Sequence, residues 1–189
     1  MEAKSKPSYL GLLNAIALGE GRAHEYLSCW AAKTPDPDVK QVLLTVAIRE
    51  GEHSHAFTKR LCELGFGVQD RPDPKHAQNM AIANADCSDL EKLEALGYRE
   101  GEISRDPFKG IFDDESIDIQ TGELLGRYIA EERDSGRKLR ACYQILRERA
   151  GRGRATSASG SELRELHGRL DEICAAIGKL QQEVTALRR

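Results

Sequence analysis

The chain has 189 residues, which is enough for one domain with its own hydrophobic core and an additional segment. Its 28 Lys and Arg residues nearly balance its 31 Asp and Glu residues, so the net charge of −3 creates no field that would attract nucleic acid or an anionic membrane. Its five cysteines form no Cys-x-x-Cys pair and are odd in number, so we expect neither a zinc knuckle nor a disulfide framework. No run of about eighteen apolar residues occurs, so we expect no membrane span and a cytoplasmic protein.

The first helix is expected over residues 8–33, because Pro7 and Ser8 favour a helix start and Pro35 stops the helix. One face of this helix is apolar and contains Leu13, Ile16, Ala17, Ala23, Leu27 and Trp30. At position 20 the same face carries a glutamate. A buried carboxylate is costly unless it is paired or bound to a metal, so Glu20 is a candidate ligand.

The second helix is expected over residues 36–64, where Asp-Pro-Asp at the start supplies an N-cap and a proline for the first turn. Steps of three and four residues place one row on a single face: Leu43, Val46, Glu50, His53, Phe57, Leu61 and Leu64. Glu50 and His53 therefore point where core residues are expected. Glu-x-x-His on a helix also places a carboxylate and an imidazole one turn apart, which suits a metal ion.

The segment between residues 66 and 88 reads as an irregular connection with a short helix at 76–84, followed by a helix at 88–97 that Ser88 and Glu91 cap. The longest bundle helix is expected to run from about residue 115 or 118 to residue 149. Its core-facing row is Leu125, Tyr128, Glu132, Ser135, Leu139, Cys142 and Leu146. Glu132 is the glutamate of this row, and three glycines in the same helix suggest a close contact with a neighbouring helix.

Three segments are predicted: a helical bundle over residues 1–149, a flexible linker over 150–160 and an amphipathic coiled-coil-like helix over 161–189. The linker prediction depends on the small and polar sequence Ala-Gly-Arg-Gly-Arg-Ala-Thr-Ser-Ala-Ser-Gly. The last segment carries an apolar seam: Leu163, Leu166, Leu170, Ile173, Ile177, Leu180, Val184 and Leu187. A single helix with such a seam is marginal in water, so we expect a homo-oligomer through residues 161–189, with docking on the bundle or another protein as alternatives.

Two helical segments carry a family resemblance. Gly-Glu-Gly-Arg-Ala-His-Glu-Tyr at residues 19–26 and Arg-Glu-Gly-Glu-His-Ser at 49–54, with Glu-Leu-Gly at 63–65, resemble the ferritin-like and rubrerythrin-like proteins. The resemblance implies an all-α fold, a ferritin-like antiparallel helical bundle. It also implies that glutamates and two Glu-x-x-His pairs bind two iron or manganese ions that react with dioxygen or peroxide.

Carried over residue by residue, the resemblance assigns Glu20 to the glutamate of the first helix and Glu50 with His53 to the first Glu-x-x-His pair. The last bundle helix departs from the family pattern, because Glu132-x-x-Ser135 stands where the second Glu-x-x-His pair is expected. Alternative ligands are Asp134 through a Glu131-x-x-Asp134 pair, Glu91 or Glu94 from the short helix, and Glu52 with His55 in a different register. We prefer Glu50 and His53 because their face is more continuously apolar.

These observations predict a ferritin-like metal-binding protein in which Glu20, Glu50, His53 and Glu132 hold iron or manganese. The implied activity is that of a di-iron or mono-metal oxidoreductase acting on dioxygen, peroxide or iron. The alternative is a non-enzymatic interaction module whose acidic core groups pair with one another and whose last segment provides assembly. No residue pattern indicates the substrate.

Overall fold

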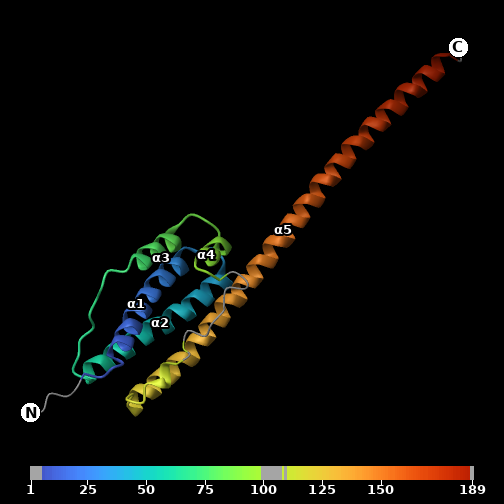
Figure 1. Cartoon of the computed structure of the whole chain (residues 1–189). Coiled ribbons are helices and arrows are strands. Elements are labelled where there is room, and N and C mark those ends of the chain that lie inside the picture. Colours follow the sequence, from blue (N-terminus) through green and yellow to red (C-terminus); the bar gives the residue numbers. More distant parts are fainter. Residues whose placement is uncertain (1–5, 99–107, 109, 188–189) are drawn as a thin grey trace, which may run out of the picture. The chain divides into compact units, whose positions relative to one another are not determined.

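The computed structural model describes residues 6–98, 108 and 110–187, with side chains up to residue 152 and again at 167–170. The helices are α1 (Leu10–Lys33), α2 (Pro37–Glu63), α3 (Pro74–Asn84), α4 (Asp89–Ala95) and α5 (Ile119–Leu187), and a 3-10 turn, η1 (Ile111–Asp113), precedes α5 (Figure 1). The described residues contain no strand, which confirms the all-α prediction. The chain divides into two compact units, Met1–Ile145 and Leu146–Arg189.

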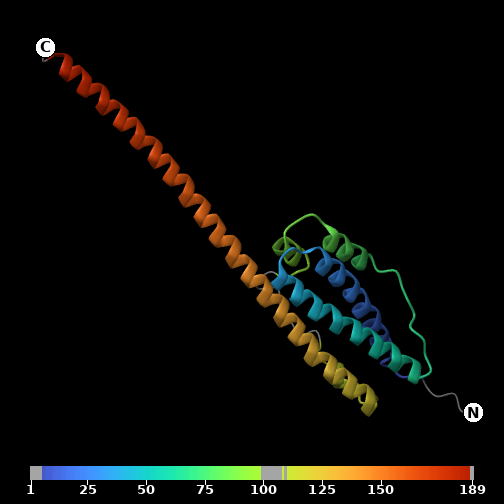
Figure 2. The ribbon, with the colours of Figure 1, turned by 180° about the vertical axis from the view of Figure 1, so that it is seen from behind.

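The helix starts follow the local sequence. The Asp36 side chain accepts hydrogen bonds from the backbone N–H groups of Asp38 and Val39, at 2.9 and 3.3 Å, and Pro37 occupies the first turn of α2. At α4, Ser88 and Glu91 form the predicted capping box. The connection between Lys33 and Pro37 is only three residues long, so α1 and α2 run antiparallel, and they lie side by side in Figures 1 and 2.

Two glycines set the close approach of α1 and α2. A Cβ atom at Gly21 would lie 2.9 Å from the Ser54 hydroxyl oxygen, and a Cβ atom at Gly51 would lie 3.0 Å from Nδ1 of His24. The close helix contact predicted at Gly122, Gly126 and Gly136 of the long helix is wrong. A Cβ atom would meet nothing within 4 Å at Gly126, Ile117 at 3.8 Å at Gly122, and Arg140 of the same helix at 3.3 Å at Gly136. The tight helix contact therefore lies between α1 and α2, beside Glu20 and Glu50.

The first part of α5 packs antiparallel to α2 within the first unit. Arg60, near the end of α2, donates to Asp118 and Thr121 around the start of α5, whereas Arg49, about three turns earlier, donates to Asp134. On the other side of α1 lies α3 (Figure 1). The three long segments α1, α2 and the start of α5 consequently face one another.

Apolar layers lie on both sides of the positions that carry the candidate ligands. One hydrophobic cluster contains Tyr9, Leu10, Leu13, Ile16, Ala17, Phe57, Leu61, Leu125, Tyr128 and Ile129. Further along the same helices the buried apolar side chains include Leu27, Trp30, Leu43, Val46, Leu139 and Cys142. Each fully buried leucine in these layers contributes about 1.5–3 kcal/mol. The layers therefore hold the three helices rigidly around the polar positions between them.

The second unit is helical from its start. Residues 150–160, which the sequence predicts as a flexible linker, continue α5 without a break. Alanine and arginine in this segment are good helix formers, and extending an existing helix costs less than starting a new one. Of the predicted seam, Leu170 is described and is 61% exposed, whereas the other seam side chains lie outside the described side chains. Across the part of the chain that the structure describes, no helix is long and apolar enough to cross a membrane.

Candidate metal centre

The four predicted ligands meet at one place. Glu20 comes from α1, Glu50 and His53 come from α2, and Glu132 comes from α5. One potential ligand atom from each residue lies within 4.8 Å of the corresponding atoms of the other three. Glu20, Glu50 and His53 are buried and Glu132 is half-buried. Three helices thus bring together side chains that are up to 112 residues apart in the sequence.

The Nδ1 atom of His53 faces the three carboxylates. It lies 3.4 Å from Glu132 Oε1 and 3.9 Å from both Glu20 Oε2 and Glu50 Oε2. His53 Nδ1, Glu20 Oε2 and Glu132 Oε1 are buried and have no hydrogen-bond partner. Each buried polar atom without a partner lowers the stability of the fold by about 1–3 kcal/mol, and three such atoms lie together here. A cation bound between these atoms would remove all of these losses.

The other atoms of the cluster are satisfied by neighbouring side chains. Glu131 Oε2 lies 2.7 Å from His53 Nε2, and its second oxygen, Oε1, accepts from Arg127 Nε at 3.0 Å. The Tyr128 hydroxyl donates to Glu20 Oε1 at 2.8 Å. Hydrogen bonds of this kind commonly orient metal ligands through the atoms that do not bind the metal. They leave Nδ1 of His53 and one oxygen of Glu20 directed at the common point.

Burial and mutual repulsion perturb the protonation of the cluster. Burial, with the neighbouring Glu20 and Glu132 carboxylates, raises the pKa of Glu50 to about 11. Burial alone would lower the pKa of His53, but Glu132, Glu20 and Glu131 outweigh burial and raise it to about 10. Burial likewise disfavours ionised Glu20, yet its interactions with His53, Glu50 and Tyr128 together outweigh burial and lower the Glu20 pKa. In the absence of a cation, protons on Glu50 and His53 therefore moderate the negative charge.

The donor set fits iron or manganese. Three carboxylates and one imidazole supply oxygen and nitrogen donors, which both metals accept, and no thiolate is present among the four. The unpartnered buried atoms and the carboxylate behind His53 fit a site that can hold a metal ion, whichever ion it is. The cluster can therefore hold a metal ion, although the donors alone do not select between the two metals.

Ser135, at the position where the family pattern has its second histidine, is hydrogen-bonded to Arg49. Ser135 is 3% exposed, and its hydroxyl accepts from Arg49 Nη1 at 3.1 Å. The same Arg49 nitrogen donates to Asp134 Oδ2 and to the backbone carbonyl of Glu131, both at 3.0 Å. Asp134 is therefore paired with a guanidinium outside the cluster. Glu131 contacts His53 and is not among the four residues whose ligand atoms converge.

The remaining alternative ligands also lie elsewhere. Glu52 and His55 are exposed, and His55 Nδ1 is bonded to the backbone carbonyl of Gly51 at 2.7 Å. In the short helix, Glu91 caps α4 and Glu94 accepts from Tyr143 at 3.4 Å. The structure thus favours the register with Glu50 and His53 over the register with Glu52 and His55.

The sequence alone does not indicate that three side chains contact the candidate ligands or their partners: Tyr128, Glu131 and Arg127. Tyr128 reads there as a packing residue, and it both packs in the hydrophobic cluster and binds Glu20. A signal for the other two exists in the four-residue spacing from Arg127 to Glu131, which favours an ion pair on one helix face. That pattern is common on helix surfaces, so it does not by itself indicate a contact with His53.

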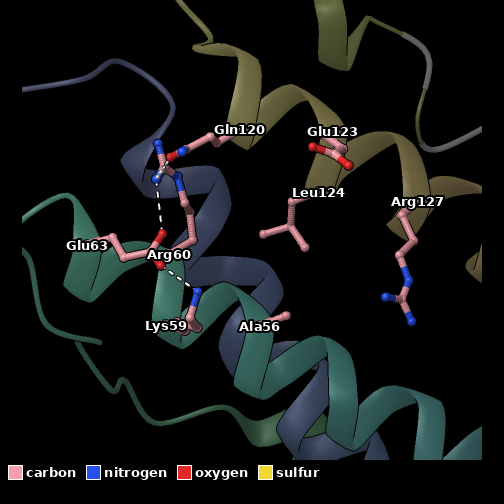
Figure 3. Close-up of a pocket in the computed structure, with 8 residues that line it drawn as sticks. All are labelled: Ala56, Lys59, Arg60, Glu63, Gln120, Glu123, Leu124 and Arg127. Atoms are coloured by element: carbon pink, nitrogen blue, oxygen red, sulfur yellow. Dashed lines mark hydrogen bonds and ion pairs between the residues drawn. The ribbon is translucent and has the colours of Figure 1, made fainter.

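A pocket of about 390 Å³ opens between α2 and the first part of α5, and Arg127, the partner of Glu131, is one of its lining residues (Figure 3). Its lining includes three cationic side chains, and each has a carboxylate partner. Figure 3 shows Lys59 and Arg60 joined to Glu63, whereas Arg127 lies apart from them and pairs with Glu131. The basic residues of this pocket are therefore neutralised, and the pocket supplies no evident anion site.

Comparisons with known protein families, with curated proteins and with solved structures gave no significant match. The interpretation of the site consequently depends on its own geometry.

Proposed function

We propose that the chain is a ferritin-like metal-binding protein that holds one iron or manganese ion through Glu20, Glu50, His53 and Glu132. The observation that carries the proposal is the set of three buried, unpartnered donor atoms that face one point from three helices. Structural ion pairs in a protein core normally satisfy their atoms with one another. A cation bound between these atoms would pair them, which would explain why they do not pair with one another.

One cation is proposed instead of two because the second Glu-x-x-His pair is replaced. Ser135 is occupied by Arg49, and Asp134 is bound to the same guanidinium, so neither is available as an extra donor. The guanidinium also brings a permanent positive charge to this side of α5. Repulsion by that charge disfavours a second metal ion nearby.

The chain's own residues would bind and orient the ion and exclude water from it. Three of the four ligands are buried, Tyr128 holds Glu20 and Glu131 holds His53. When bound, iron or manganese would supply one-electron chemistry on dioxygen or peroxide. Reaction with these small molecules is part of the proposal.

Elemental analysis of the full chain, expressed with added iron and manganese, tests the proposal. We expect about one metal ion per chain, lost in Glu50→Ala/His53→Ala. Glu52→Ala/His55→Ala is a matched control, because it removes the same residue types at the same spacing from the exposed face of α2. Retention of metal in the control is expected. Metal-free wild-type protein would overturn the proposal, and about two ions per chain would overturn the single-ion part.

A second proposal concerns assembly: residues 161–189 associate with the same segment of a second copy. An apolar a/d seam on a helix can pack against a second copy of itself, and the described seam residue Leu170 is 61% exposed. We expect Leu170→Glu/Ile177→Glu to lower the mass of the full chain in sedimentation experiments. Gln182→Glu, which lies off the seam in the sequence, should leave the mass unchanged. A wild-type monomer at every concentration would refute self-association.

A further inference from the structure

Two adjacent glutamates of α5 behave differently. Glu132 directs an unpartnered oxygen, Oε1, towards His53 Nδ1, whereas both oxygens of Glu131 have partners. The side chains of these two residues are similarly shielded, at 20% and 27% exposed. A difference in exposure therefore does not explain why Glu132 has an oxygen without a hydrogen-bond partner and Glu131 has none.

The contacts of Glu131 determine the orientation of His53. A carboxylate only accepts hydrogen bonds, and Arg127 Nε, which always carries a proton, already donates to Glu131 Oε1 at 3.0 Å. The His53 Nε2 atom at 2.7 Å must then carry a proton and donate it to Glu131. An imidazole that is protonated at Nε2 can bind a cation only through Nδ1, which is the atom that faces the carboxylates.

We propose that Arg127 and Glu131 form a positioning pair that fixes His53 with Nδ1 towards the cation and keeps the Glu131 carboxylate out of the coordination set. This inference rests on the proposed metal site. Arg127 holds Glu131 Oε1 at 3.0 Å while His53 holds Oε2, so neither oxygen is free to turn to the ion. The pair thereby limits the ligands to four.

The two members of the pair should differ in importance. Glu131 touches His53 directly, and its side chain is 27% exposed. Arg127 acts through Glu131, and its side chain is 67% exposed at the edge of the pocket in Figure 3. Solvent screens such an exposed ion pair, so removing Arg127 should weaken the arrangement less than removing Glu131.

Titration of the full chain with Co²⁺, followed by calorimetry, tests the affinity. We expect Glu131→Ala to weaken Co²⁺ binding about 10–100-fold, Glu131→Gln to weaken it less because the amide oxygen still accepts, and Arg127→Ala to weaken it a few-fold. Arg137→Ala is the matched control: Arg137 is 65% exposed on the same helix and pairs with Asp134, not with Glu131. This variant should bind as the wild type does. Thermal unfolding of each metal-free variant verifies that it is folded.

The ring N–H proton supplies a readout that loss of packing would not move. In Co²⁺-loaded wild-type protein, the His53 Nε2 proton should appear in the NMR spectrum as a shifted, slowly exchanging signal. It should persist in Glu131→Gln and vanish in Glu131→Ala. Equal affinity and an unchanged signal in Glu131→Ala would overturn this inference alone, and equal binding by Arg127→Ala and Arg137→Ala would remove Arg127 from it. Wild-type protein that binds no Co²⁺, iron or manganese would overturn the proposed function instead.

Discussion

Two groups of buried charge lie on α2 and α5, and they are built differently. Around Arg60, every guanidinium nitrogen has an acceptor at 3.0 Å or less: Nε binds Thr121, Nη1 binds Gln120 and Glu63, and Nη2 binds Asp118. Around His53, three buried donor or acceptor atoms have no partner. The first group is a closed network, and the second is open at one point.

Burial of a charge therefore does not by itself mark a binding site. Arg60 and His53 are similarly hidden, with 8% and 4% of the residue exposed. What separates them is whether the surrounding atoms complete the hydrogen bonds of the charged group. A complete set of hydrogen bonds indicates a structural role, whereas the incomplete set around His53 supports the proposed metal site.

The largest effect is expected from breaking the closed network. Arg60→Met should lower the free energy of unfolding by about 3–5 kcal/mol, because it leaves Asp118 and its neighbours without their counter-charge. Denaturant unfolding measures this change, and metal content should not change. Lys59→Ala, which removes a 76% exposed neighbour, is the control and should stay within about 0.5 kcal/mol. Similar losses of unfolding free energy in both variants would show that the hydrogen-bond network around Arg60 adds no stability beyond that of an exposed ion pair.

The open cluster should respond to metal. At a free metal concentration 100 times the dissociation constant, the wild-type chain should gain about 2.7 kcal/mol of stability, visible as a higher melting temperature. Glu50→Ala/His53→Ala should show no such gain. A gain of equal size in the double variant would place the stabilising ion elsewhere on the chain.

Glu50→Gln should stabilise the metal-free protein at neutral pH while weakening metal binding. Burial and the neighbouring carboxylates raise the folded-state pKa of Glu50 to about 11, whereas the unfolded value is about 4.3. The unfolded state then binds fewer protons at pH 7, so wild-type stability falls as the pH rises above about 4. The amide avoids this cost, and a gain on the order of 2 kcal/mol at pH 7 that disappears near pH 4 is expected. Urea unfolding at several pH values would contradict this if the variant were less stable throughout.

The smallest effect is expected at Asp118, whose side chain is 37% exposed. Burial opposes its ionisation, but hydrogen bonds from Thr121, Tyr9 and Arg60 outweigh burial and lower the Asp118 pKa. The ionised group therefore stabilises the fold above the unfolded pKa of about 4, and this contribution is lost as the pH falls further towards the folded pKa. Asp118→Asn should cost about 1 kcal/mol at pH 7, after allowance for solvent screening, and progressively less below pH 4. A difference that is constant from pH 7 to pH 3 would argue against this account.

The candidate ligands were predictable because each interrupts a regular apolar row. Glu20, Glu50, His53 and Glu132 occupy core-facing positions that helix periodicity identifies without knowledge of the packing. Glu131 could not be assigned in this way, because it lies beside the row of α5 and reaches His53 only through the way α5 packs on α2. Helix periodicity gives the face of a residue but not its partner on another helix.

Residues 150–160 show a second limit of sequence reasoning. Their small and glycine-rich composition is typical of a linker, but the single helix α5 runs through them. Local composition gives the intrinsic preference of a segment, whereas the continuation of a helix depends on its neighbours as well. The glycines of α5 are misleading for a related reason, since a glycine signals a close contact only where another helix is present, as at Gly21 and Gly51.

Those two glycines give the site a fixed width. Each is the sequence neighbour of a candidate ligand, Glu20 or Glu50, and neither has room for an added methyl group without displacing Ser54 or His24. The spacing between α1 and α2 is therefore limited by these two glycines, each of which has only a hydrogen atom where another residue would have a side chain. A change of roughly 0.2 Å in that spacing would equal the tolerance within which metal–ligand distances are normally held. Discrimination among ions of equal charge would then depend on contacts between helices that never touch the ion.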